Sequence, residues 1–171
     1  MVTSSSTPDW SRERKTSFSW QPSRALLRSI RQYQKYAGSS NYFFKLLSKL
    51  EVIKYRFWSA ITGADIPLNS KIAGGLILPH PNGVVIHPDA IIGPNCLIFQ
   101  QVTIGSGKNG TPPIIGGNVD IGAGAKIFGN IRIGNHVVIG SNAVVIKDVP
   151  DYHTAIGVPA VIKRRITSVA K

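Results

Sequence analysis

Aliphatic residues return at every sixth position in the C-terminal half of the chain. The longest uninterrupted run comprises Ile115, Ile121, Ile127, Ile133, Ile139 and Val145. An α-helix would need a period near 3.6 and a half-buried strand a period of 2, so neither explains this pattern. A fixed hexapeptide period is typical of a parallel β-helix, in which three short faces make a coil of about 18 residues. The sequence therefore predicts an all-β solenoid with these aliphatic residues stacked inside.

The same period starts earlier and is interrupted twice. It also includes Ile66, Ile72, Leu78, Ile86, Ile92, Ile98 and Ile104. Extra residues fall at 79–83, between Leu78 and Ile86, and at 106–113, between Ile104 and Ile115. A solenoid accommodates insertions as loops, and such loops often lie on the binding face. We therefore expect the chemistry at these two interruptions.

Two amphipathic helical patterns precede the repeats. The first opens at Pro22, and the second runs from about Tyr42 to Ile61, with Asn41 as a candidate N-cap and Gly63 as its end. The apolar face expected for the second helix consists of Phe43, Leu46, Leu47, Leu50, Ile53, Phe57 and Ile61. We expect these helices to close the end of the coil and to pack on neighbouring subunits. Docking of their basic surface on an anionic membrane is a compatible alternative.

The chain length suits one domain with a small appendage. Residues 1–21 are polar and are expected to be disordered, residues 22–64 to form the helical region, residues 65–156 the β-helix and residues 157–171 a basic tail. The N-terminal residues lack the apolar stretch of a secretory signal. A single cysteine, Cys96, occupies an inward position and permits no disulfide within the chain. These features predict a cytoplasmic protein, with a peripheral place at the inner face of the membrane as the alternative.

The net charge of +12 is concentrated at the two ends of the chain. Residues 1–64 carry eleven Lys or Arg and three Asp or Glu, residues 65–162 carry five of each, and the last nine carry four and none. No nucleic-acid-binding motif accompanies this charge, so a nucleic-acid partner is not expected. An acidic ligand or an anionic membrane surface accounts for basic ends equally well.

Several collinear segments resemble the hexapeptide-repeat acyltransferases, and most closely the serine acetyltransferases and related O-acetyltransferases of polysaccharide clusters. The matching segments are residues 75–83 (GLILPHPNG), 101–105 (QVTIG), 122–131 (GAGAKIFGNI) and 157–160 (GVPA). The resemblance implies a left-handed coil, a homotrimer or a dimer of trimers, acetyl-CoA as the donor, and an active site between subunits.

The resemblance also implies a catalytic pair. In that family a His in the segment equivalent to residues 78–80 is the general base, with an Asp fifteen residues upstream as its partner. The corresponding residues here are His80 and Asp65. Imidazole has a pKa suited to removing a proton from a hydroxyl, and a carboxylate on its other nitrogen fixes the tautomer.

For the donor, the resemblance places pantetheine near Gly105, Ala123 and Ser141. The nucleotide end would then lie near Gly157, Pro159, Lys163 and Arg164, where cations suit the phosphates of coenzyme A. A solvated tail explains the last two residues equally well. No metal is expected.

The sequence departs from the serine acetyltransferase pattern at positions that concern the acceptor. Pro79 replaces an acidic residue, and Thr111 and Pro112 stand where that family has an Arg-His pair. These changes remove charged groups that would bind an amino acid. The sequence therefore slightly favours a sugar hydroxyl of a polysaccharide precursor over L-serine, with genuine serine acetyltransferase activity as the alternative.

Two other classes remain as alternatives. A zinc enzyme like the γ-type carbonic anhydrases needs three convergent His ligands, and the four His residues, at 80, 87, 136 and 153, lack the required spacing. A non-catalytic scaffold would leave the joint presence of Asp65 and His80 unexplained.

Overall fold

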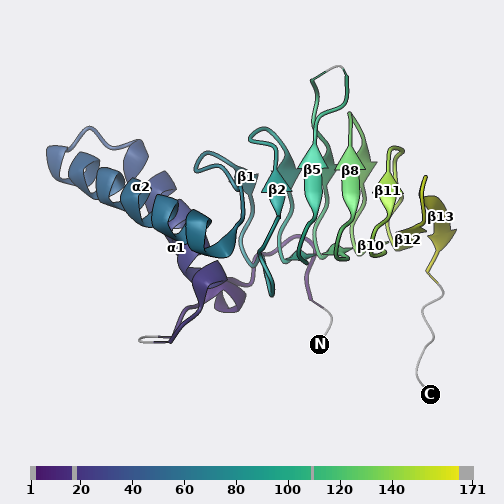
Figure 1. The fold of residues 1–171 in the computed structure, drawn as a ribbon, viewed down its shortest axis with the longest axis horizontal. Helices are drawn as coiled ribbons and strands as arrows, with labels where there is room; N and C mark the ends of the chain where they lie inside the picture. The colour runs from purple at the N-terminus through teal and green to yellow at the C-terminus, as the bar shows by residue number, and fades with distance from the viewer. Residues whose placement is uncertain (1–2, 17–18, 109, 166–171) are drawn as a thin grey trace.

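A computed structural model describes residues 3–16, 19–108 and 110–165. Short strands follow two helices along the chain (Figure 1). The strands are β1 (Lys71–Ile72), β2 (Val85–Ile86), β3 (Ile91–Ile92), β4 (Leu97–Ile98), β5 (Thr103–Gly105), β6 (Ile114–Ile115), β7 (Asp120–Ile121), β8 (Lys126–Phe128), β9 (Arg132–Ile133), β10 (Val138–Ile139), β11 (Val144–Val145), β12 (His153–Ile156) and β13 (Val161–Arg164).

The strands form three sheets whose neighbours are parallel, except at the C-terminal end. One sheet has the order β1-β3-β6-β9, another β11-β8-β5-β2, and the third β13-β12-β10-β7-β4. From β2 to β11 the chain visits the three sheets in turn, so it winds as a three-sided coil. The predicted parallel sheets and short helical region are confirmed.

The pairing register gives the length of one coil. Lys126 of β8 pairs with Val144 of β11, and Asp120 of β7 pairs with Val138 of β10, which are steps of 18 residues. Thr103 of β5 pairs with Lys126, a step of 23 residues, because residues 106–113 leave the coil. Figure 1 shows this segment projecting beyond the coil after β5.

The coil interior contains the residues that the hexapeptide period predicts. Each of the thirteen aliphatic residues of the two runs is buried, with an exposed fraction of at most 7%. Cys96 is fully buried among them, and this burial raises the pKa of its thiol to about 11. Each residue of the six-residue period thus points its side chain into the coil, one on each face, as predicted.

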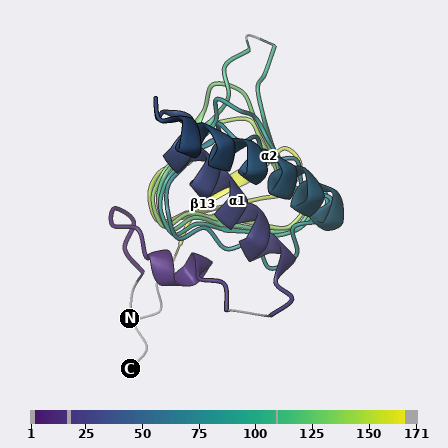
Figure 2. The same ribbon diagram turned by 90° about the vertical axis from the view of Figure 1, so that its left-hand side faces the viewer.

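Two helices, α1 and α2, cover the N-terminal end of the coil (Figure 2). Helix α1 (Pro22–Ala37) starts with Pro in its first turn, and Leu26, Leu27 and Ile30 join the core of the coil. Helix α2 (Tyr42–Thr62) is capped by Asn41, whose side chain accepts a hydrogen bond from the Phe43 amide.

The apolar face predicted for α2 lies on the outer side of the helix in the single chain. Its buried residues are Glu51 and Thr62, and Tyr55 and Trp58 pack against the core. The residues of this predicted apolar face are largely exposed, for example Ile53 at 65% and Phe57 at 54%, and their expected packing on neighbouring subunits stays a prediction. Amphipathicity identifies an apolar face, but the aromatic rings on the opposite face make the contacts with the rest of the chain.

The N-terminal residues also differ from the prediction of disorder. Residues 3–16, named here the N-terminal strap, lie against the coil and include a short 3-10 helix, Trp10–Glu13. The Asn95 side chain binds the strap backbone at three points, and Glu13 pairs with Arg31 of α1 at 2.9 Å. Polar contacts therefore order a segment that has little apolar surface. Residues 1, 2, 17 and 18 of the expected disordered segment lie outside the described residues.

The expected C-terminal tail is also structured over residues 157–164. Strand β13 pairs antiparallel with β12 and closes the end of its sheet. Residues 166–171 lie outside the described residues. Within the described ranges, no helix combines the length and hydrophobicity that crossing a membrane requires.

Candidate functional site

His80 lies in the loop made by the first interruption of the repeat, between Leu78, which is buried, and β2. Both Pro79 and His80 are exposed. His80 lines an open pocket of 340 Å³ with residues from both helices and from its own loop: Pro22, Ser23, Ile61, Thr62, Pro79, Pro81 and Asn82. Apart from the imidazole, this pocket has no ionisable side chain in its lining.

Asp65 is positioned by the end of α2. Gly63 ends the helix in the left-handed region, with φ of 64°, which a residue with a Cβ adopts only at a cost. Two residues later, the Asp65 backbone bridges to Val85, and its amide donates to the Val84 carbonyl at 2.8 Å. The carboxylate is exposed and lines a second pocket, of 390 Å³, with Tyr55, Arg56 and Ser59 of α2 among its neighbours.

The Asp65 charge acts on Tyr55. Burial of the phenol and, second, the nearby carboxylate raise the pKa of Tyr55. The ion pairs within the described ranges join Arg31 to Glu13, Lys54 to Glu51 and Lys71 to Asp89, and a pair between Asp65 and His80 is not among them. The two predicted catalytic residues thus line separate pockets near the end of α2, and no ion pair joins them in the described part of the chain.

One edge of the coil connects the His80 loop with several predicted donor-binding residues. The Asn82 carbonyl accepts from the Gln101 amide, the Gln100 carbonyl from the Gly124 amide, and the Ala123 carbonyl from the Asn142 amide. These bonds stack Asn82, Gln100, Ala123 and Ser141 at one corner of successive coils. Ala123 is half-buried and Ser141 exposed, so short side chains leave the backbone accessible along this edge.

Gly105 lies at the other edge of the same sheet. It ends β5 and pairs with Phe128 of β8. A Cβ at this position would meet the Phe128 ring at 2.9–3.0 Å. Packing of this ring accounts for a glycine here, and within one chain Gly105 does not join Ala123 and Ser141.

The remaining predicted residues lie at the C-terminal end of the coil. The Gly157 carbonyl accepts from the Val144 amide, as the Ala143 carbonyl accepts from the Lys126 amide, so Gly157 stacks on Ala143, two residues after Ser141. Pro159 is exposed in the following turn. Lys163 and Arg164 are exposed on β13, where they pair with Thr154 and His153 of the neighbouring strand β12.

The other histidines have local partners. His87 accepts from the Asp89 amide through Nδ1, the His136 ring lies against Asn118 and stacks on Tyr152, and His153 bonds the Asp151 carbonyl. No group of three potential metal ligands of the His, Cys, Asp or Glu type converges within residues 3–16, 19–108 and 110–165. These contacts agree with turn and surface roles.

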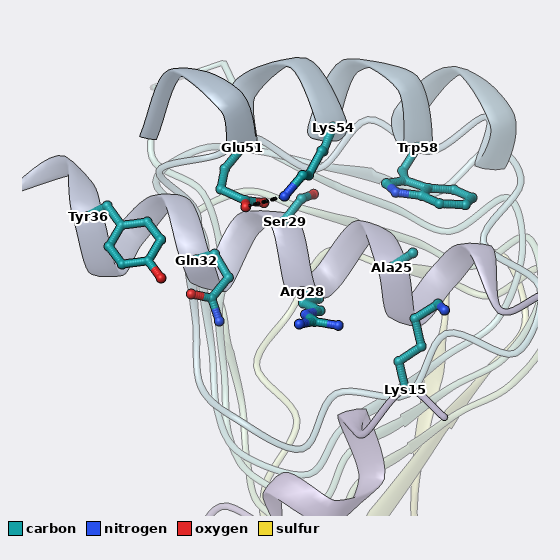
Figure 3. Close-up of a pocket in the computed structure, with 9 residues that line it drawn as sticks. All are labelled: Lys15, Ala25, Arg28, Ser29, Gln32, Tyr36, Glu51, Lys54 and Trp58. Atoms are coloured by element: carbon teal, nitrogen blue, oxygen red, sulfur yellow. Dashed lines mark hydrogen bonds and ion pairs between the residues drawn. The ribbon is translucent and has the colours of Figure 1, made fainter. Parts of the chain in front are cut away.

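A separate pocket of 410 Å³ lies between α1 and α2 (Figure 3). Lys15, Arg28 and Lys54 reach toward it, and Lys54 pairs with Glu51 at 2.7 Å. It contains none of the residues that the sequence predicts for the site.

Sequence reasoning missed the walls of the two candidate pockets. Pro22 and Ser23 reach the His80 pocket because α1 crosses the end of the coil, and Tyr55 reaches Asp65 because α2 turns its aromatic face inward. Both contacts depend on the tertiary packing of the helices. No local motif in the sequence indicates them.

Comparisons with known proteins bear on the family. No family model matches the chain. The serine acetyltransferase of Synechococcus elongatus is 44% identical over 104 residues, which are 58% of this chain and 42% of that protein. The serine acetyltransferase of Staphylococcus aureus is 45% identical over 107 residues, which are 61% of this chain and 50% of that protein. The chain therefore spans about half the length of these curated relatives.

Solved structures agree with the sequence comparison. A serine acetyltransferase from Brucella abortus has a TM-score of 0.71 and 30% identity, over 85% of this chain and 58% of that one. A serine acetyltransferase in complex with CoA has a TM-score of 0.69 and 32% identity, over 84% and 58%. The resemblance of this chain to the hexapeptide-repeat acyltransferases, and among them to the serine acetyltransferases, is therefore confirmed by sequence and by fold.

Proposed function

We propose that this protein is an acetyl-CoA-dependent O-acetyltransferase with L-serine as its acceptor. The observation that carries the proposal is the position of His80, in the loop that begins the coil edge on which Ala123 and Ser141 follow. Relatives named serine acetyltransferase support it, as do structural neighbours that are complexes with CoA and, for the soybean enzyme, with serine. The slight sequence-based preference for a sugar acceptor finds no support in these relatives.

In the proposed reaction, the His80 imidazole removes the proton of the acceptor hydroxyl as the oxygen attacks the thioester carbonyl. The new C–O bond forms and the C–S bond breaks. The proton on the imidazole then passes to the departing CoA thiolate, so the base returns to its starting state. The exposure of His80 and the apolar and small residues around it suit a base that must meet an incoming hydroxyl.

Asp65 is proposed to orient the His80 imidazole and to stabilise its cation. This role requires the two side chains to approach each other, because they are not paired here. Catalytic hydrogen bonds are often long or poorly aligned without substrate and tighten in the complex. The carboxylate has no Lys, Arg or His ion-pair partner within the described ranges, which leaves it able to rotate.

The donor is proposed to lie along the edge of small residues, with pantetheine at Ala123 and Ser141. Its nucleotide end would lie near Gly157, Pro159, Lys163 and Arg164, where two exposed cations suit phosphate oxygens. Gly105, at the opposite edge of the sheet, would reach the same donor from a second copy of the chain. This division of the site is one reason to propose a homotrimer.

The proposed assembly is a trimer of left-handed parallel β-helices, and the fold likeness to serine acetyltransferases supports it. Light scattering should give about three times the mass of one chain. A fully active monomer would contradict the proposal that two chains share one active site.

A sugar hydroxyl is the second candidate acceptor. The observation that favours it is the lining of the His80 pocket, which contains no charged group that could bind the carboxylate or ammonium of serine. Each lost charge-assisted hydrogen bond costs about 1.5–3 kcal/mol. Loss of two would raise the serine KM by a factor of about 10²–10⁴.

Thiol release from acetyl-CoA distinguishes the two acceptors. The purified protein is assayed with L-serine, with D-serine as a matched control, and with a panel of sugars and sugar nucleotides. A serine KM in the millimolar range or below and strong selectivity over D-serine support the proposal. Slow turnover with serine and faster turnover with a saccharide would contradict the proposal that serine is the acceptor and would favour a sugar hydroxyl.

A further inference from the structure

The exposed face of α2 carries a continuous line of large apolar side chains. We name this line the α2 stripe; it consists of Phe43, Leu46, Leu50, Ile53, Phe57 and Ile61. Their exposed fractions range from 45% to 65%. The spacings of three and four residues place all six on one side of the helix. A connected apolar surface of this kind usually marks an interaction site.

The charges beside the α2 stripe have one sign. Lys45, Lys49 and Arg56 are exposed and follow each other along one margin of the stripe. The single acidic residue of the helix, Glu51, is buried and paired with Lys54 on the side that faces α1 (Figure 3). The apolar surface is therefore bordered by positive charge, and no carboxylate of α2 balances it.

A second copy of the chain is a poor match for this surface. The stripe has heptad-like spacing, so two stripes could pack as a coiled coil. In a parallel pair, Lys49 of one helix would oppose Lys54 of the other, and in an antiparallel pair the cationic margins would oppose each other. Like charges at these flanking positions disfavour such pairing.

We propose instead that the α2 stripe binds the surface of an anionic lipid bilayer, with the helix axis in the plane of the surface. An interfacial helix combines an apolar face, which enters the acyl boundary, with Lys and Arg beside the headgroups. The stripe and its cationic margin have this arrangement. The 21 residues of α2 give this face a length of several turns.

The position of α2 permits this contact. Figures 1 and 2 show α2 at the outer end of the molecule, beyond the closed end of the coil. Ile61 belongs both to the stripe and to the lining of the His80 pocket. Binding through the stripe would therefore hold that pocket near the membrane surface. The membrane contact itself does not depend on the reaction proposed above.

Vesicle flotation with the full chain tests the proposal. The vesicles contain phosphatidylcholine alone or phosphatidylcholine and phosphatidylglycerol in equal parts. Wild type should float with the anionic vesicles, less at high salt, and remain unbound with phosphatidylcholine alone. The variant K45Q/K49Q/R56Q should lose about 100-fold in affinity, because each of the three cations near such a surface contributes about a fivefold step.

Two further variants separate charge, apolar contact and folding. L50S/I53S changes exposed residues, so it should keep the fold and lose vesicle binding. K108Q/R132Q/K147Q removes three exposed cations from the coil and is the matched charge control, with binding close to wild type. Circular dichroism and light scattering of each variant give its folding and particle mass.

Several outcomes would overturn the proposal. One is wild type that stays unbound on anionic vesicles at low salt. Another is equal loss of binding in the α2 and coil charge variants, which would mean attraction by net charge alone. A third is a change of particle mass in L50S/I53S with no effect on vesicles, which would assign the stripe to contacts between copies of the chain.

Discussion

The contact between Asn95 and the N-terminal strap gives the most detailed stability prediction. Asn95 is 1% exposed and adopts a positive φ of 62° at a corner of the coil. Its Nδ2 donates to the carbonyls of Ser4 and Thr7, and its Oδ1 accepts from the Asp9 amide, each at 2.8 Å. Replacing Asn95 by Gly removes all three bonds and still permits the positive φ.

The expected effect is local. Three hydrogen bonds at about 0.5–1.5 kcal/mol each sum to about 1.5–4.5 kcal/mol, and the lower half applies because the released strap groups regain water. A loss of about 2–3 kcal/mol raises the population of the open strap roughly 30- to 150-fold, at 1.4 kcal/mol per tenfold. Glu13 and Arg31 remain paired, so residues 4–9 should open most.

Hydrogen exchange measures this opening. In Asn95→Gly, the amide of Asp9 should exchange roughly 30- to 150-fold faster, while amides of the coil strands change little. The matched control is Asn118→Gly, which changes an equivalent corner residue with a positive φ of 53°. The Asn118 side chain bonds the His136 ring and not the strap. Unchanged exchange at Asp9 in Asn95→Gly, or equal acceleration in both variants, would refute the role of Asn95.

The remaining predictions concern buried groups. The Cys96 thiol should resist alkylation in the native protein and react fully in denaturant, because it is buried and its pKa is raised to about 11; rapid native-state labelling would contradict its burial. Asp120→Asn should raise the Tm at pH 7, because burial raises the pKa of this carboxyl above its ordinary 3.8 and so disfavours the charged form. The stability that wild-type Asp120 contributes falls as pH rises through the raised pKa, so the difference in Tm should shrink below about pH 4. Ile127→Ala, at a fully buried coil position, should cost about 2–5 kcal/mol in chemical denaturation.

The coil could be predicted from the sequence because its geometry repeats. Each inward position needs an aliphatic or small residue at a fixed interval, so Ile115, Ile121 and Ile127 report the same local environment. The two interruptions of the repeat could also be predicted from the sequence, because extra residues between Leu78 and Ile86 must leave the coil as a loop. That loop holds His80, which the sequence therefore places correctly relative to the repeat.

Contacts between segments distant in sequence were less predictable. The sequence predicts the apolar side of α2 but not which side meets the coil: Tyr55 and Trp58 make the inward contacts and Ile53 faces outward. The strap is held by polar groups, chiefly Asn95 and Arg31, which composition alone does not reveal. The fifteen-residue interval between Asp65 and His80 brings them to the same end of the coil but not into contact.

The central claim is that His80 is the base of an acetyl-CoA-dependent transferase, and kinetics of His80→Ala test it most directly. The matched control is His87→Ala, which changes a histidine bonded to a neighbouring turn amide. With the best acceptor, His80→Ala should lower kcat by about 10²–10⁴ while the Kd for acetyl-CoA stays near that of wild type, and His87→Ala should retain most activity. Turnover of His80→Ala close to that of wild type would contradict the account.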